Sequence, residues 1–278
     1  MARKINEKLI DRMTSGDLAP LLNYLKSEVR KLRLEVRLNG KAYIYYKKCK
    51  VLDLGLMSYN IDDKYFEKNC KPINIKDKVI NCPSQYFKET LSIVDKWLEK
   101  HRKSEFETQQ YIAFHNQEIK DKYIILDMEY NFSQSGIEEG IRVKQAGFDL
   151  LGIERLTGNI VFFEVKKGLG ALPGTSGIKE HIVDFEECLY GRHKEIFRKN
   201  LITDIKNIVH DKKKLELLDN FELPASFSLD DISLKFVFES DYSDKAAYLK
   251  IFEKEYQASK SNRHYETIYL TDNCYKLL

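Results

Sequence analysis

The sequence lacks several features that would settle its class at once. Its five cysteines include no CxxC pair, and their odd number and irregular spacing indicate neither a zinc knuckle nor a disulfide framework. No run approaches the roughly 18–20 apolar residues that cross a bilayer. The first residues, Met-Ala-Arg-Lys-Ile-Asn-Glu, lack the apolar stretch of a signal peptide. We therefore expect reduced thiols, a cytoplasmic location and no membrane partner.

A strong charge of one sign is also missing. The chain has 46 basic and 43 acidic residues, for a net charge of +3. An electrostatic argument for nucleic-acid binding must therefore rest on local patches rather than on the whole chain. What the chain does have is apolar material, because 43% of its 278 residues are hydrophobic. This supplies the core of one large or two modest domains.

The N-terminal part changes its hydrophobic period once. Residues 1–28 follow helix-like intervals, and Ser15-Gly16-Asp17 divides them into two helices, with Asp17 as the expected N-cap of the second. Apolar and charged residues then alternate over 31–38, which predicts a half-buried strand. Asn39-Gly40 is the favoured pair for a tight hairpin turn, and 42–46 supplies the returning strand. A further strand is expected around 51–57.

A boundary is expected where the composition turns polar. Residues 60–83 contain Pro72, Pro83 and several Asn and Asp residues, so we interpret them as a long connection. The expected domains are residues 1–83, a helix and β-hairpin module, and residues 84–278.

The second domain begins with helical periodicity over 84–119 and continues into strands. Strands are expected at 123–130, 146–154, 159–166, 236–239, 247–252 and 265–269, with a hairpin turn at 156–159 and helices over 179–219. The expected fold class is α+β, with a mixed central sheet flanked by helices.

Three polar residues stand out on two of these strands. Glu164 and Lys166 lie two residues apart, so they share one face of their strand, and the hairpin sets Asp149 on the neighbouring strand. Two converging carboxylates offer hard oxygen ligands suited to Mg²⁺. Such an ion polarises a phosphodiester and lowers the pKa of an attacking water, while a lysine neutralises developing negative charge.

The segments Gly147-Phe148-Asp149-Leu150-Leu151-Gly152 and Val161-Phe162-Phe163-Glu164-Val165-Lys166 resemble the PD-(D/E)XK superfamily. This superfamily includes restriction endonucleases, Holliday-junction resolvases and many phage-defence nucleases. The resemblance covers about residues 105–210 and implies a restriction-endonuclease-like core. It also implies metal binding by Asp149 and Glu164, support of the nucleophile by Lys166, and a role in bacterial defence or mobile-element biology. Phe148 stands where the family has proline.

Some members of that superfamily add a glutamate from the preceding helix. Glu105 and Glu107 are both candidates, but residues two apart on a helix diverge, and we favour Glu107 for the catalytic set. Glu129, at the end of the first strand, is a further candidate. His181 begins the helix after the Gly-rich loop and is either a site residue or, as is commoner for a lone histidine, a structural one.

A basic, aromatic hairpin is the most charged local feature. Residues 30–50 carry eight basic side chains against the single acidic Glu35. Such a ribbon suits phosphates and bases, or else it protects an exposed sheet edge from aggregation. The nucleic-acid-binding candidates are Arg33, Arg37, Lys41 and Tyr45, together with Lys167 beside the Glu-x-Lys motif.

The sequence thus predicts an enzyme, a Mg²⁺- or Mn²⁺-dependent endonuclease that hydrolyses phosphodiester bonds in DNA rather than RNA. The alternative is an inactive nuclease fold that binds nucleic acid or a partner protein. A homodimer is left open.

Overall fold

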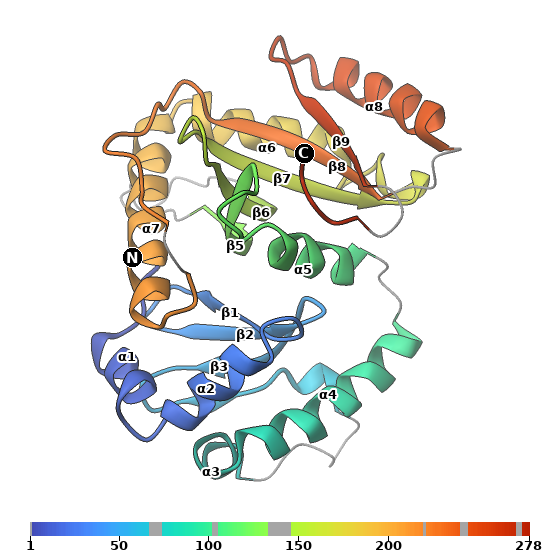
Figure 1. The fold of residues 1–278 in the computed structure, drawn as a ribbon. Helices are drawn as coiled ribbons and strands as arrows, with labels where there is room; N and C mark the ends of the chain where they lie inside the picture. The colour runs from blue at the N-terminus through green and yellow to red at the C-terminus, as the bar shows by residue number, and fades with distance from the viewer. Residues whose placement is uncertain are drawn as a thin grey trace. The chain divides into compact units, whose positions relative to one another are not determined.

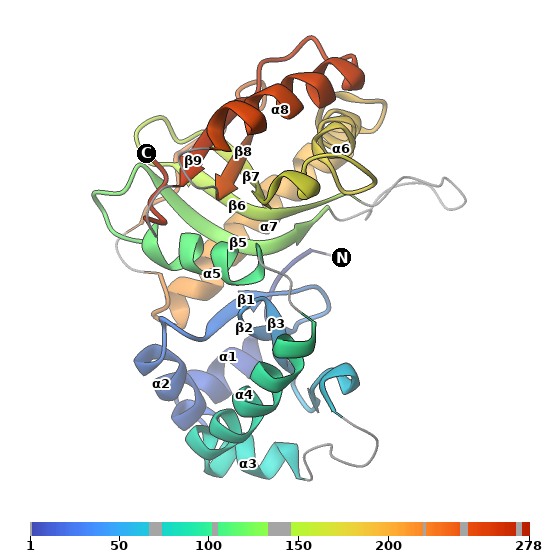
Figure 2. The same ribbon diagram turned by 90° about the vertical axis from the view of Figure 1, so that its right-hand side faces the viewer.

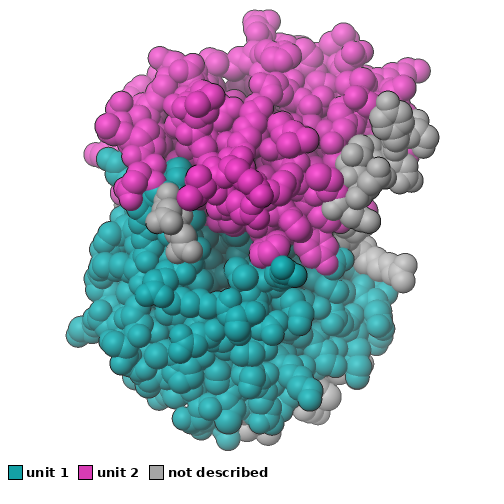
Figure 3. Space-filling view, in the orientation of Figure 1, with its two compact units in different colours: residues 1–110, 206–221 teal, residues 111–205, 222–278 magenta. Residues whose placement is uncertain are grey.

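The computed structural model describes residues 2–66, 74–101, 105–132, 146–218, 221–239, 244–270 and 274–278. The chain forms two compact units (Figure 3). Unit 1 comprises residues 1–110 and 206–221, and unit 2 comprises residues 111–205 and 222–278. Within the described ranges, no helix is long and apolar enough to cross a membrane.

Unit 1 is built on a four-stranded antiparallel sheet, with its strands in the order in which they occur in the chain. Helices cover one face of this sheet (Figures 1 and 2). The strands are β1 (Arg33–Val36), β2 (Ala42–Tyr46), β3 (Cys49–Leu54) and β4 (Tyr59–Asn60). The helical elements are α1 (Glu7–Thr14), α2 (Ala19–Ser27), η1 (Asp63–Tyr65), α3 (Ile75–Asn81) and α4 (Pro83–Lys100).

The expected helix pair and hairpin are confirmed. Leu34 and Val36 are buried as expected, but Glu35 and Arg37 are buried as well, so β1 is not the half-buried strand that the alternation predicted. The turn residues Asn39 and Gly40 have φ angles of 62° and 75°. The hairpin loop has three residues, 38–40, because Val36 pairs with Ala42 and the Arg37 N–H donates to the Lys41 carbonyl, so the expected two-residue turn was wrong.

The expected N-cap of the second helix was wrong. Leu18, not Asp17, is the N-cap of α2, because Asp17 is held by Arg12 at 2.8 Å.

The expected long connection over 60–83 is also partly wrong, since η1 and α3 lie within it. Some of the polar residues of this range lie on the short amphipathic helix α3, in which Val79 is buried. Polarity alone does not separate such a helix from a loop.

Unit 1 extends past the expected boundary at residue 83, and two sets of contacts explain this. Helix α4 packs on the sheet: the Tyr86 hydroxyl donates a hydrogen bond to the Val51 carbonyl at 2.7 Å, and the Phe87 ring stacks on Tyr24. In the 206–221 segment, Lys212 pairs with Glu35 at 2.6 Å. Unit 1 is therefore assembled from two stretches that are distant in sequence.

Unit 2 is built on a mixed five-stranded sheet in the order β5-β6-β7-β8-β9. The first three strands are antiparallel, and β8 and β9 continue the sheet in parallel with β7. The strands are β5 (Tyr123–Asn131), β6 (Gly147–Glu154), β7 (Ile160–Lys167), β8 (Ser233–Glu239) and β9 (Glu266–Leu270). The protein is thus α+β, with one mixed and one antiparallel sheet.

The helices of unit 2 are α6 (Ile178–Tyr190) and α8 (Lys245–Ser259), with the short η2 (Leu169–Ala171) before α6. Helix α5 (Glu105–His115) and helix α7 (Lys194–Lys214) each contribute residues to both units. α6 and α8 lie side by side (Figure 2). Aromatic contacts fix both on the sheet, with Phe162 against Phe185 and Phe236 against Phe252.

One strand was predicted wrongly in unit 2. Residues 247–252 belong to helix α8, in which Tyr248 and Phe252, four residues apart, are the buried positions. A short apolar run fits a strand and one face of a helix equally well. The other five strands are confirmed.

Candidate functional site

The candidate site lies where the ladder between β6 and β7 stops. The last paired residues at this end are Leu150 and Phe163, so the next residues along the two strands are Asp149 and Glu164. Asp149 Oδ2 accepts a hydrogen bond from the Val165 backbone N–H at 2.8 Å. A side-chain oxygen thus takes a backbone donor of the neighbouring strand, which anchors the Asp149 carboxylate beside the Glu-x-Lys segment.

Glu164 and Lys166 form a buried ion pair. Lys166 Nζ lies 2.7 Å from Glu164 Oε1, and the two side chains are only 6% and 4% exposed. The alternation of β7 puts both on one face, as the sequence predicted. Lys166 Nζ also donates to the Ser176 carbonyl at 2.7 Å. The ammonium is therefore held by a carboxylate and by the loop that follows the strand.

His181, near the start of α6, joins this pair. Its Nε2 lies 2.8 Å from Glu164 Oε1, and its side chain is 15% exposed. From the sequence, His181 was expected to follow the Gly-rich loop. No sequence pattern decided whether it is a site residue or a structural residue. Its position four residues after Gly177, the N-cap of α6, sets it against Glu164.

The charge state of Glu164 follows from these neighbours. Burial by itself raises the pKa of the Glu164 carboxyl because it disfavours the charged form. The electrostatic interactions of Glu164 with His181 and Lys166 outweigh burial and hold this pKa below its usual value. Glu164 is thus an ionised carboxylate inside the protein.

Three atoms of this group are buried without a hydrogen-bond partner in the described part of the chain. They are the second oxygen of Glu164, Oε2, and both ring nitrogens of His181, whose Nε2 lies close to Glu164 Oε1 but not in hydrogen-bond geometry. Buried polar atoms are rarely left unpaired in proteins, so an unpaired carboxylate oxygen at the end of a ladder points to a ligand or water. Across the described residues, however, no group of three or more His, Cys, Asp or Glu side chains is arranged to hold a metal ion.

The Gly-rich loop between β7 and α6 fixes the position of Ser176. The Gly168 N–H donates to the Tyr248 hydroxyl at 2.7 Å, and Gly168 has a φ of 81°. At the other end, a Cβ on Gly177 would lie 2.5 Å from the Leu172 carbonyl oxygen. Glycine is therefore required there for the close turn that brings the Ser176 carbonyl to Lys166.

The remaining acidic candidates are not brought to Glu164 by any observed contact. Glu107 lies in unit 1, where its carboxylate is 3.7 Å from Lys47 Nζ and its side chain is 45% exposed. The side chain of Glu105 lies outside the described residues. Glu129 is half-buried in β5, with a φ of 57°. A catalytic role for Glu107 remains a prediction.

The expected nucleic-acid-binding residues are engaged with neighbouring groups. Arg33 pairs with Glu35, and Lys41 pairs with Asp53 at 3.1 Å. Arg37 is buried and donates to the Tyr45 hydroxyl at 3.3 Å.

Lys167, at the end of β7, pairs with Glu239 at 2.7 Å. These partners reduce the positive charge that the predicted residues offer to a polyanion. Their binding of nucleic acid also remains a prediction.

Comparisons of the chain with protein-family models, with curated proteins and with solved structures found no match. The functional argument therefore rests on the geometry of the site and on the motif in the sequence.

Proposed function

We propose that unit 2 is a metal-dependent nuclease that hydrolyses phosphodiester bonds, with DNA as the substrate. The observation that supports this most directly is the arrangement at the end of the β6–β7 ladder. Asp149 and the buried Glu164–Lys166 pair lie there together, and Glu164 Oε2 has no hydrogen-bond partner among the described residues. The strand order also agrees with the resemblance, because the Asp-bearing and Glu-x-Lys-bearing strands are antiparallel neighbours in a mixed sheet.

The carboxylates fit a divalent cation of the Mg²⁺ type. Mg²⁺ in proteins is commonly held by one or two carboxylates while it retains several waters, so Asp149 and Glu164 would suffice as protein ligands. The unpartnered Oε2 of Glu164 is an oxygen that such an ion would satisfy. When bound, the cation would polarise the phosphodiester and lower the pKa of a bound water.

The protein's own groups have separable tasks. Lys166 presents a buried ammonium beside Glu164, where positive charge stabilises the anionic oxygens of a phosphoryl group more strongly than it would in water. The Ser176 carbonyl orients that ammonium. His181 holds the Glu164 carboxylate, so it acts on the site by positioning.

One observation favours a second function, that of a nuclease fold that binds nucleic acid without cutting it. Glu164 Oε1 already faces both Lys166 and His181, and no three-ligand group is present among the described residues. If these two contacts keep Glu164 from binding a metal, Asp149 alone would remain to recruit one.

Cleavage assays separate the two functions. Single-stranded DNA, duplex DNA and RNA are incubated with the protein and Mg²⁺ or Mn²⁺. We expect DNA cleavage by the wild type, its loss in Glu164→Gln and Lys166→Met, and its retention in Glu253→Gln, an exposed position on α8. Circular dichroism verifies that each variant folds. A wild type that binds DNA yet cleaves none of the three substrates with either metal would overturn the enzyme proposal.

A further inference from the structure

Unit 1 contains a pocket between η1 and the C-terminal half of α4. Its volume is about 480 Å³, within the range of small-molecule sites. It is lined by Lys64, Tyr65, Phe66, Ile93, Lys96, Trp97, Lys100 and His101, and we call it the Trp97 pocket. Three lysines and no acidic residue are present in this lining.

The spacing of these residues on α4 explains why they share one wall. Ile93 and Trp97 are four residues apart, and Lys96 and Lys100 repeat the same interval three positions later. Residues three and four apart lie on the same face of a helix, so apolar and basic side chains share a single stripe of α4.

The aromatic rings form a layered platform. His101 stacks on Trp97, with ring centroids 4.4 Å apart and an interplanar angle of 11°. Tyr65 contacts the Trp97 ring edge-on at 5.2 Å and is buried. The imidazole is kept in place because His101 Nδ1 lies 2.9 Å from the Trp97 carbonyl oxygen. A flat, exposed ring on top of a fixed stack can receive another planar ring.

The lysines at this platform are not equally neutralised. Lys64 pairs with Asp62 at 3.3 Å and lies over the Tyr65 ring. Lys96 is exposed and forms no ion pair with any carboxylate in the described ranges. Exposed lysines usually serve only solubility. Here the lysines lie beside stacked aromatic rings in a concave site. Solubility alone would not require this arrangement.

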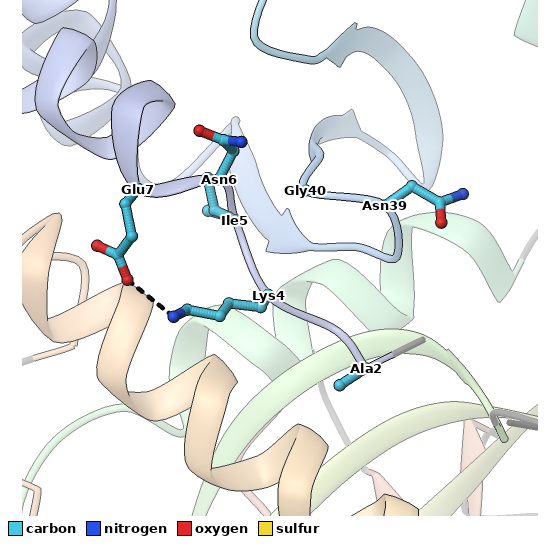
Figure 4. A pocket seen from close by; sticks show the side chains of 7 residues that line it. All are labelled: Ala2, Lys4, Ile5, Asn6, Glu7, Asn39 and Gly40. Carbon is cyan, nitrogen blue, oxygen red and sulfur yellow. Dashed lines mark ion pairs between the residues drawn. The ribbon is translucent and has the colours of Figure 1, made fainter. Parts of the chain in front are cut away.

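A second pocket in unit 1 provides the contrast. It is lined by Ala2, Lys4, Ile5, Asn6, Glu7, Asn39 and Gly40 and has a volume of about 770 Å³ (Figure 4). It has no aromatic ring, and Figure 4 shows its lysine, Lys4, paired with Glu7 at 2.9 Å. This larger pocket has neither a ring on which a base could stack nor a lysine without an acidic partner. Pocket size alone is therefore no reason to expect a ligand there.

We propose that the Trp97 pocket binds a nucleotide, with the base extending the Trp97–His101 stack and the phosphate beside Lys96 and Lys100. Aromatic side chains accept any base, since every base has a π-face, and lysines bind phosphate as point charges. The same chemistry is presented by a free mononucleotide and by one nucleotide of a single strand. This site lies wholly in unit 1, so it goes beyond the nuclease proposal and stands without it.

The chain reports on this pocket directly, because Trp97 is its only tryptophan. Purified protein is titrated with AMP, adenosine, inorganic phosphate and a short single-stranded oligonucleotide, and tryptophan fluorescence is followed. We expect saturable quenching by AMP and at least about tenfold weaker binding of adenosine, since a charged hydrogen-bonded contact is lost. Tighter binding of the oligonucleotide than of AMP would identify a nucleic-acid strand as the source, and the reverse order a free nucleotide.

Variants assign the quenching to the pocket. Lys96→Glu combined with Lys100→Glu should weaken AMP binding at least about tenfold. His101→Ala should weaken it roughly 5- to 150-fold by removing the ring on which the base stacks.

The matched control is Lys76→Glu combined with Lys88→Glu, which makes the same charge change at exposed positions of α3 and α4 outside the pocket. Equal affinity in all four proteins, or no saturable quenching by any nucleotide, would overturn the proposal.

Discussion

Among the residues that the structure describes, each unit has a buried Glu–Lys pair, and the two pairs differ in what surrounds the carboxylate. In unit 1, Lys212 Nζ lies 2.6 Å from Glu35 Oε2, with side chains 5% and 0% exposed. In unit 2, Lys166 Nζ lies 2.7 Å from Glu164 Oε1, with nearly the same burial. Distance and burial therefore do not distinguish them.

The free oxygen does distinguish them. Glu35 uses both carboxylate oxygens, because Oε1 is taken by Arg33 and Oε2 by Lys212. Glu164 leaves Oε2 without a hydrogen-bond partner among the described residues. The Glu35 pair also joins residues 177 positions apart, whereas Glu164 and Lys166 are two apart. We infer that the first pair ties two chain segments together and that the second is kept for a ligand.

The largest expected effect is on the stability of unit 1. Lys212→Ala leaves the buried Glu35 without the ammonium that pairs with its Oε2, and removal of one partner of a buried pair costs about 3–5 kcal/mol. Urea unfolding should show this loss, while Lys199→Ala, at an exposed site on the same helix, should change stability little. A loss below about 1 kcal/mol in Lys212→Ala would mean that the pair does not tie the segments together.

Cysteine alkylation locates that loss. Cys49 in unit 1 and Cys188 in unit 2 are both buried, and burial raises the pKa of Cys188 to about 12 and also raises that of Cys49. Neither thiol reacts until its surroundings open, since the thiolate is the nucleophile. Lys212→Ala should speed alkylation of Cys49 more than that of Cys188, as measured by peptide mass spectrometry. Equal acceleration would show that the two units open together.

The second effect is on activity. If the nuclease proposal holds, Lys166→Met should lower the cleavage rate about 100- to 1000-fold, the size of effect seen when one preorganised donor is removed. Its stability loss should be smaller than that of Lys212→Ala, because His181 Nε2 remains 2.8 Å from Glu164 Oε1. If Lys166→Met were fully active but severely unstable, the two pairs would have the same structural role. The proposal that the Glu164–Lys166 pair serves catalysis would then be wrong.

The third effect concerns the loop that orients Lys166. A Cβ at Gly177 would lie 2.5 Å from the Leu172 carbonyl oxygen, so Gly177→Ala should cost about 1–3 kcal/mol and lower activity. Gly170→Ala in the same loop is the matched control, because a Cβ there meets nothing within 4 Å. Thermal unfolding and cleavage rates measure both. Equal behaviour of the two variants would show that the loop adapts without disturbing the Ser176 contact.

The sequence was informative where the cause is local. Period-two alternation and the turn residues predicted β1, β2 and the strands that carry Asp149 and Glu164. The short interval between Glu164 and Lys166 brought them to one face without help from the rest of the fold. What these residues do chemically stays a prediction that the motif makes and the geometry supports.

The sequence failed where the cause is tertiary. The excess of basic residues in 30–50 was counted without its partners, and the structure supplies Asp53, Asp95 and Glu107 from other elements of unit 1. The Lys212–Glu35 contact joins residues 206–221 to the rest of unit 1. Its two residues are far apart in the sequence, so no local sequence pattern predicts it. His181 reaches Glu164 only because Gly177 starts α6 at the right place.

The smallest effect tests whether burial, rather than pairing, gives these ion pairs their importance. Lys167 adjoins the buried pair and contacts Glu239 at 2.7 Å, but its side chain is 37% exposed. Because water screens an exposed pair, Lys167→Ala should change the free energy of unfolding by less than about 1 kcal/mol. The same variant tests the predicted nucleic-acid contact, since loss of one phosphate-binding lysine lowers the slope of log affinity against log salt by about one. An unchanged slope would confine Lys167 to its pair with Glu239, and the buried Lys166, one position earlier in β7, would then be the lysine of this strand that contacts the substrate.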